Sequence, residues 1–367
     1  MAIAGEQICS MTARPIPIDW HPGLPVFASG AFLKAVSDDY GWLGGIDASG
    51  ALRCVLPYTI IRKGIFRLVR FRVETIPLDE DLSLQEEKAF LESCVSYLRS
   101  VGGDVVIPPT TNTIFRTYPD GADAAPYGSY IVDLQQPEDI LWKNISRITR
   151  QNIGTAERDG VSTRSGLEYL DAAHALIKET FSRSKLPFMN CESLRRFMLG
   201  LGDKGKLIIA EYQGVMQSCV IYAFSDYCAY AVYAGNVVPQ HQGANKLVYW
   251  EAFRLFKKLG AKRFDFVGAR INPEKGSKQE AINLFKQRLG AKLTQGYIWK
   301  YPLRPWRSLA YSYGVRLLRG GDIVDLERHK MKDGSGTEKS FVEACHGSLV
   351  KMVTPPKAKK REEHFLC

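Results

Sequence analysis

A chain of 367 residues is about twice the usual length of a single domain, so two domains are expected. Hydrophobic residues make up 45% of the chain and aromatic residues 11%, a composition that excludes a disordered or fibrous protein. The 49 Lys and Arg outnumber the 39 Asp and Glu, and the net charge of +10 favours a polyanionic partner such as RNA, a nucleotide diphosphate or an anionic membrane surface.

The first predicted elements are a β-hairpin, a helix and a strand. Residues 41–63 have the pattern of two strands joined by a turn at Gly50. Apolar residues at three-to-four spacing then predict a helix over 84–101, which ends at Gly102. The run DVVIP predicts the strand that follows.

The same order of elements returns in the second half of the chain. Residues 206–224 form another hairpin pattern around Gly214, and the run YCAYAVYAG predicts a further strand. A helix from about Asn245 ends at Gly260, before the strand run KRFDFVG. This repetition indicates two tandem domains of the α/β (α+β) class, each a mixed, mostly antiparallel sheet flanked by helices.

Two further helices are expected before the second hairpin, over 138–160 and 167–184. A stretch rich in Pro, Gly, Asp and Ala separates the halves, so we expect domains at 1–125 and 126–303. Residues 304–367 form a basic, aromatic C-terminal extension, and its charged, proline-containing end from Thr354 is expected to be a mobile tail.

No stretch approaches the ~20 apolar residues needed to cross a bilayer, and the first residues lack the pattern of a signal peptide. We therefore expect a cytoplasmic protein. The eight cysteines and six histidines show no zinc-site or catalytic-triad spacing, so we expect neither a metal nor a bound cofactor.

Four runs occur in an order and spacing that are typical of one family. They are YIVDLQQPEDILWKNISRITRQNIGTAERDGV, YAVYAGN, GANKLVYWEAFRLFKKLGAKRFDFVG and NLFKQRLGA. Over about 130–303 the chain thus resembles the Fem family of aminoacyl-tRNA-dependent peptidyltransferases, a branch of the GNAT acetyltransferase superfamily. The resemblance implies two tandem GNAT-like domains, and the absence of an extended heptad pattern predicts no coiled-coil arm.

The resemblance implies an acyltransferase that moves an aminoacyl group from aminoacyl-tRNA to an amine of a peptidoglycan-precursor-like peptide. The expected partners are aminoacyl-tRNA and a cell-wall or glycan precursor, which can be lipid-linked, with a peripheral contact at the inner membrane surface. An aminoacyl ester is already activated, so the reaction requires a positive or hydrogen-bond-donating group at the developing oxyanion rather than a metal.

The expected catalytic residues come from the second domain. Phe285 and Lys286 form the pair that the family places beside its acyl-transfer centre, with Lys286 stabilising charge; a solvated helix lysine is the alternative. Asp265 would orient the attacking amine or act as a general base if burial raises its pKa, or else pair with an arginine. Tyr230 and Tyr233 lie on the strand that borders the clefts in this superfamily, although strand aromatics also simply pack.

Basic residues are the expected substrate-binding groups. Arg147 and Arg150 lie on a helix that has no acid from 143 to 156, which suits phosphate contact. In the first domain, Arg62 and Lys63 are the candidates for the basic residue with which some family members hold a precursor's diphosphate.

Two other interpretations remain open. The run QHQGAN, with Gly243, resembles a degenerate form of the loop that cradles the CoA pyrophosphate at a helix start. That feature favours an acyl-CoA-dependent N-acyltransferase acting on an amino sugar or polysaccharide precursor. The other alternative is an inactive module that binds RNA or a precursor. Residues 300–320 combine cations and aromatics without an acid, which suits a membrane surface, an RNA backbone or a helix strapped across the domain interface.

Overall fold

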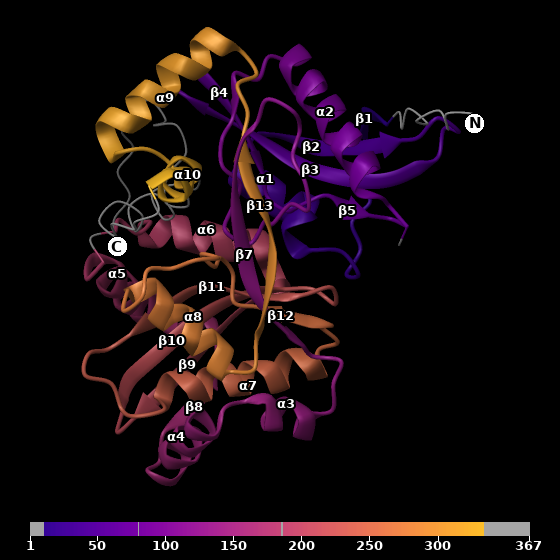
Figure 1. Cartoon of the computed structure of the whole chain (residues 1–367). Helices are drawn as coiled ribbons and strands as arrows, with labels where there is room; N and C mark the ends of the chain where they lie inside the picture. The colour runs from indigo at the N-terminus through magenta and orange to yellow at the C-terminus, as the bar shows by residue number, and fades with distance from the viewer. Residues whose placement is uncertain (1–10, 80, 185, 334–367) are drawn as a thin grey trace, which may run out of the picture.

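The computed structural model describes residues 11–79, 81–184 and 186–333. Within them the chain forms two mixed sheets, each flanked by helices, and the first sheet lies above the second in Figure 1. Neighbouring strands are antiparallel except for two parallel pairs, one in each sheet. This arrangement confirms the predicted fold class.

The first sheet has the order β1-β2-β3-β4-β6, with β5 paired to β3. Its strands are β1 (Thr12–Ile16), β2 (Asp39–Ile46), β3 (Leu52–Lys63), β4 (Phe66–Phe71), β5 (Ile76–Pro77) and β6 (Val105–Val106). The accompanying helices are the short η1 (Val26–Ala28), α1 (Gly30–Val36) and α2 (Leu84–Ser100). The predicted hairpin, helix and strand of this half are therefore confirmed. With 17 residues, α2 is the longest helix in the described part of the chain.

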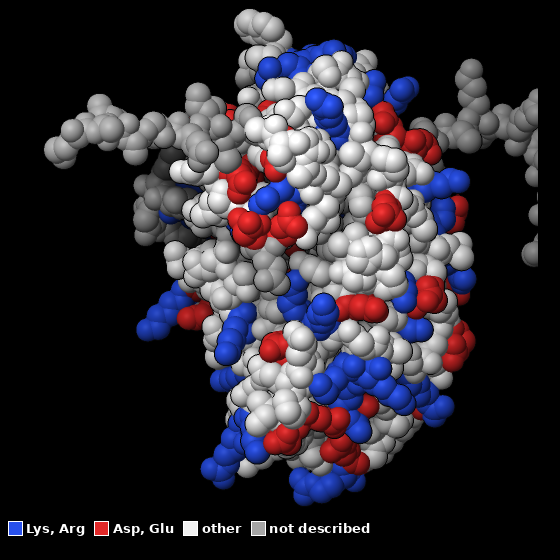
Figure 2. Space-filling view, turned by 90° about the vertical axis from the view of Figure 1, so that its right-hand side faces the viewer, with Lys and Arg blue, Asp and Glu red and all other residues white. Residues whose placement is uncertain are grey.

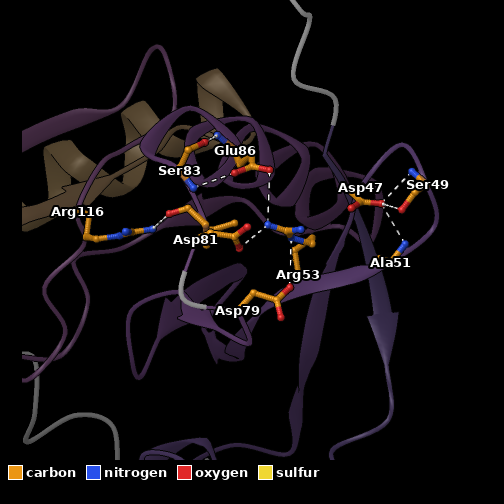
Figure 3. Close-up of polar contacts among 10 residues, drawn as sticks. Asp47, Ser49, Ala51, Arg53, Asp79, Asp81, Ser83, Glu86 and Arg116 are labelled. Atoms are coloured by element: carbon orange, nitrogen blue, oxygen red, sulfur yellow. Dashed lines mark hydrogen bonds and ion pairs between the residues drawn. The ribbon is translucent and has the colours of Figure 1, made fainter.

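A polar cluster fixes the start of α2 against β3 (Figure 3). Ser83 and Glu86 form a reciprocal capping box, in which each side chain accepts a hydrogen bond from the other residue's backbone N–H. Arg53 of β3 pairs with Asp81 at 2.8 Å and with Asp79 at 3.3 Å. These contacts hold the segment before α2 on the sheet, so that the apolar face of the helix packs on it.

The second sheet has the order β13-β7-β12-β11-β10-β9-β8. Its strands are β7 (Asp123–Asp133), β8 (Ser162–Ser165), β9 (Gly205–Tyr212), β10 (Val215–Phe224), β11 (Ala229–Asn236), β12 (Arg263–Asp265) and β13 (Lys292–Lys300). Its helices are α3 (Glu138–Asn144), α4 (Arg147–Arg158), η2 (Leu167–Tyr169), α5 (Leu170–Ser182), α6 (Cys191–Leu201), η3 (Gly202–Lys204), α7 (Ala244–Lys258) and α8 (Lys278–Arg288).

The prediction of one helix over 138–160 is wrong, because the chain breaks there into α3 and α4. Ile145 has an extended backbone, and Ser146 caps α4 by accepting a hydrogen bond from the backbone N–H of Thr149. Ile145 is buried in the core of the second half, so this extended residue turns α4 against α7.

One apolar core runs through both halves. Phe27 and Phe32, which flank the start of α1, contact Tyr230 of β11 and Phe197 of α6, with ring centroids 4.9 and 5.8 Å apart. β13 also reaches the first half, where Tyr301, just past the strand, forms a β-bridge. Both halves therefore share an interface built from side chains and backbone.

Two helices follow β13. α9 (Pro305–Arg319) packs on the first sheet near β4, and α10 (Ile323–Asp333) packs on β7. Lys300 secures α10 through ion pairs with Asp322 at 2.9 Å and Asp325 at 2.6 Å. The tail expected from Thr354 lies outside the described residues. None of the helices in the described ranges is long and apolar enough to span a bilayer.

Candidate active site

A gap opens between two parallel strands of the second sheet. β11 and β12 pair only where β11 begins and β12 ends, at Ala229 with Phe264 and at Tyr230 with Asp265. Beyond Asp265 the chain turns towards β7, whereas β11 continues to Asn236. A bulge in β11 leaves Val232 without an opposite residue on β10, which adds to the local twist and bend. The strands thus diverge and expose a space between them.

A groove of about 270 Å³ lies on one side of this gap. Its wall is formed by β10, β11, α7 and α8, through Val220, Ala234, Asn236, Asn245, Tyr249, Lys278, Ala281, Ile282 and Phe285. The side-chain oxygens of Asn236 and Asn245 are buried and have no hydrogen-bond partner among the described residues. The groove is therefore mainly apolar, with the polar side chains of Asn236, Asn245 and Lys278 in its wall.

Asp265 and Lys286 hold the turn at the base of the gap. Asp265 accepts hydrogen bonds from the Ser129 hydroxyl and from the backbone N–H of Val267, the latter at 2.7 Å. Lys286 of α8 donates to the carbonyls of Val267 at 2.9 Å and Gly268 at 2.5 Å. An ammonium has three N–H donors, so one remains available for a ligand.

The backbone of this turn is strained at Val267. Its φ of 42° lies in the left-handed region, which a β-branched side chain rarely adopts, and Gly268 follows at 64°. Such a conformation costs about 1–3 kcal/mol and persists where the surroundings enforce it. Here the two charged side chains enforce it from either side.

Burial shifts the pKa values of both charged groups towards 7. It raises the pKa of Asp265 to about 6, against the opposing effects of the Ser129 and Val267 hydrogen bonds and the Lys286 charge. Burial also lowers the pKa of Lys286 to about 8, which the charge of Asp265 counteracts. A carboxylate and an amine with such values suit proton transfer near pH 7.

Glu74, which the sequence analysis did not single out, brings a carboxyl from the first half to the same place. Burial raises its pKa to about 7, the nearby Asp265 adds to the rise, and Arg263 opposes it. Arg70, Arg72 and Glu74 alternate with apolar residues. In an extended segment this alternation puts all three charges on one face, a signal of a polar interface that was available from the sequence.

A cavity of about 30 Å³ lies between the halves, on the side of β11 that faces α1. It is lined by Phe27, Phe32, Val36, Arg72, Thr110, Thr111, Asn112, Phe197, Val232, Tyr233 and Val267. Tyr233 is buried, which raises its pKa, and the nearby Arg72 opposes the rise. Tyr230, also predicted for the site, is buried against Phe27.

The structure therefore brings five of the predicted residues around the gap: Tyr230, Tyr233, Asp265, Phe285 and Lys286. The other five lie elsewhere. Arg62 and Lys63 are exposed at the tip of the β3–β4 hairpin, close to α9. Arg147 is exposed on α4. The Arg150 guanidinium donates to three carbonyls at the end of α3, at 2.5–3.2 Å.

Gly243 caps the start of α7 in the left-handed conformation, with a φ of 93°. A Cβ at this position would lie 2.0 Å from the backbone oxygen of Asn152 in α4. The glycine thus lets α4 approach the loop before α7. Asn245 follows in the first turn of α7 and faces the groove.

No protein-family model and no curated protein sequence matches the chain. Among solved structures, FemX is similar over 76% of this chain and 92% of its own, with a TM-score of 0.57 and 13% identity. The C-terminal domain of a protein assigned as a lysylphosphatidylglycerol synthetase from Agrobacterium fabrum is similar over 79% and 92%, with a TM-score of 0.50 and 11% identity. The chain therefore has the fold that the Fem resemblance implied.

Proposed function

We propose that this chain is an acyltransferase that moves an aminoacyl group from aminoacyl-tRNA to the amine of a peptidoglycan-precursor-like peptide. One observation carries the proposal. In a chain with the FemX fold, Phe285 lies in the groove wall, and the neighbouring Lys286 binds the carbonyls of the turn at which the chain leaves β12.

The groove takes the donor's aminoacyl ester. The acceptor amine attacks the ester carbonyl, a C–N bond forms, and the C–O bond to the terminal ribose breaks. Lys286 uses its remaining N–H to stabilise the oxyanion that develops on the carbonyl. Asp265 or Glu74 accepts the amine's proton, because their pKa values of about 6 and about 7 suit a general base. The protonated carboxyl then returns this proton to the ribose oxygen as it leaves.

The acceptor lies on the side of the interdomain cavity. Arg72 and Tyr233 line this cavity from the two halves, and Glu74 approaches Asp265 from the first half. A cell-wall or glycan precursor that approaches from this side would present its amine to the base of the gap. If that precursor is lipid-linked, the enzyme works at the inner membrane surface. We retain Arg62, Lys63, Arg147 and Arg150 as weaker candidates for phosphate contact.

An acyl-CoA donor is the second candidate, because α7 begins with a left-handed glycine and has no acid in its first turn. Two features weigh against it. The space beside Gly243 is filled by the Asn152 carbonyl, and Asn245 stands where a small residue would let phosphates approach. We therefore place aminoacyl-tRNA first.

Donor binding across a salt series tests this choice. Binding of aminoacyl-tRNA is expected to weaken steeply as salt rises, because phosphate contacts release counterions. Acyl-CoA carries far fewer charges and would show a shallow slope. Tight binding of acyl-CoA with no preference for charged tRNA would overturn the proposed donor and point to an amino-sugar acyltransferase. Failure to bind either donor would favour an inactive module that binds a precursor.

A further inference from the structure

α9 presents an apolar stripe to solvent. Successive residues of a helix are 100° apart, so Trp306, Leu309, Ala310, Tyr313 and Leu317 fall within about 100° of its surface. All five are exposed, Trp306 by 82% and Leu317 by 70%. A stripe of this width is normally buried against a core, yet none of the described elements covers this one.

The opposite face of α9 is firmly docked on the first sheet. The Ser308 hydroxyl donates to the backbone oxygen of Asp104 at 2.8 Å, and Tyr311 packs edge-on against Phe66 at 5.6 Å. The buried Asp104 carboxylate also pairs with Arg307 at 3.3 Å. The outward direction of the apolar stripe is therefore set by a specific interface and not by chance rotation of a loose helix.

The hairpin tip of β3 and β4 extends this surface. Arg307 donates to the backbone oxygen of Ile65 at 2.9 Å, which holds the tip beside α9, and Ile65 is itself exposed. Arg62 and Lys63 are exposed on the same tip. We call α9 together with residues 62–65 the α9 surface.

The charge of the α9 surface has one sign. Residues 300–320 contain no Asp or Glu, and neither do residues 62–73. By helical position, Arg316 borders one edge of the apolar stripe. The exposed Arg62 and Lys63 of the hairpin tip supply cations beyond Arg307, which is itself paired with Asp104. Figure 2 views the molecule from the side away from α9, and there too Lys and Arg side chains gather at the upper end. Apolar and aromatic residues flanked by arginines are the pattern of a helix that lies in a lipid interface.

We propose that the α9 surface docks the protein on an anionic phospholipid bilayer. The aromatic and leucine side chains of α9 enter the boundary between headgroups and acyl chains, and the flanking cations contact lipid phosphates. The phosphates of a nucleic acid would pair with the cations, but the leucine side chains would stay exposed to water. A lipid interface accommodates both the apolar side chains and the cations of the α9 surface.

This docking would also fix how the gap between β11 and β12 is oriented relative to the membrane. That consequence rests on the proposed function. α9 packs on the first half, whereas the donor groove lies in the second half (Figure 1). The first half, from which Arg72 and Glu74 reach the acceptor side, would face the membrane, and the donor groove would face the aqueous phase. A lipid-linked acceptor and a tRNA would then approach from different directions.

Vesicle binding by the full chain tests the inference without any acyl transfer, so its failure is separable from failure of the proposed function. Wild-type protein is expected to co-sediment with phosphatidylglycerol-containing vesicles and much less with pure phosphatidylcholine vesicles. Trp306 is the most exposed of the six tryptophans, so binding should shift the fluorescence to shorter wavelength, and Trp306→Phe should remove most of that shift.

Leu317→Asp is expected to weaken vesicle binding at least about tenfold, because it removes an apolar contact and adds a repelled charge. Leu199→Asp is the matched control, since Leu199 is 78% exposed near the end of another helix, α6, and should leave binding unchanged. Equal loss in both variants, or no binding of wild type to anionic vesicles, overturns the proposal. The proposal is also overturned if the wild type is a dimer that Leu317→Asp dissociates while vesicle binding is unchanged. It is equally overturned if Leu317→Asp weakens tRNA binding alone.

Discussion

At the scale of single residues, Glu74 is the group whose protonation should most affect stability. Its pKa in the folded protein is about 7, well above the ordinary value for a glutamate, because Glu74 is partly buried and lies near Asp265. The folded state therefore binds the proton more tightly than the unfolded state. This contribution to stability is complete below pH 4 and is lost as the pH rises through 7.

Glu74→Gln should remove most of this loss. We expect the wild-type free energy of unfolding to fall from pH 5 to pH 8 by on the order of 2 kcal/mol more than that of the variant. Urea unfolding at the two pH values measures the difference. Glu157→Gln, at an exposed position of α4, is the control and should follow the wild type. A Glu74→Gln curve parallel to the wild-type curve would show that Glu74 is not a buried titrating group.

The residue scale also shows why the site was only partly predictable. Phe285, Lys286 and Asp265 stand within runs that carry the family's pattern, so they could be selected from the sequence. Glu74 belongs to the other half and becomes part of the cluster only when the halves dock. Arg150 was selected for its charge, yet its guanidinium contacts carbonyls of α3, a local geometry that depends on the break at Ile145.

At the scale of elements, the loop before α7 is where the addition of a single methyl group should lower the stability most. Gly243→Ala would force a Cβ against the Asn152 backbone and a left-handed φ on alanine. We expect a loss of about 2–4 kcal/mol in the free energy of unfolding, because α4 and α7 must move apart. Thermal or urea unfolding measures the loss.

Gly154→Ala provides the comparison within the same helix pair. A Cβ at Gly154 meets nothing within 4 Å, and the residue is helical in α4. This variant should gain about 0.5–1 kcal/mol, because alanine loses less conformational freedom on folding. If Gly243→Ala were as stable as Gly154→Ala, the close approach of α4 to this loop would be wrong.

Elements with strong local signals were predictable, and those set by packing were not. The two hairpins, α2 and α7 have glycine turns or helix-ending glycines and clear apolar periodicity. The division of 138–160 into α3 and α4 leaves the periodicity almost intact, because only Ile145 and Ser146 separate the helices. β12, with three residues, gains its place from its neighbours β7 and β11 rather than from its own sequence.

At the scale of the whole molecule, the repeated order of elements was enough to predict two tandem domains. It did not predict how they join. The shared core around Phe27 and Tyr230, and the bridge from Tyr301 to the first half, depend on contacts between residues far apart in the chain. This joining brings Glu74 to Asp265 and forms the acceptor side of the proposed site from both halves.

The most direct test of that chemistry is transfer of a labelled aminoacyl group from tRNA to the amine of a cell-wall precursor peptide, by wild type and by Lys286→Met. Wild type should form the labelled peptide, and the variant should be about 100- to 1,000-fold slower, the usual cost of removing one oxyanion donor. Lys257→Met is the matched control, because Lys257 also holds two backbone carbonyls but lies at the far end of α7. Label transferred from acyl-CoA but not from aminoacyl-tRNA, or equal rates for wild type and Lys286→Met, would contradict the account.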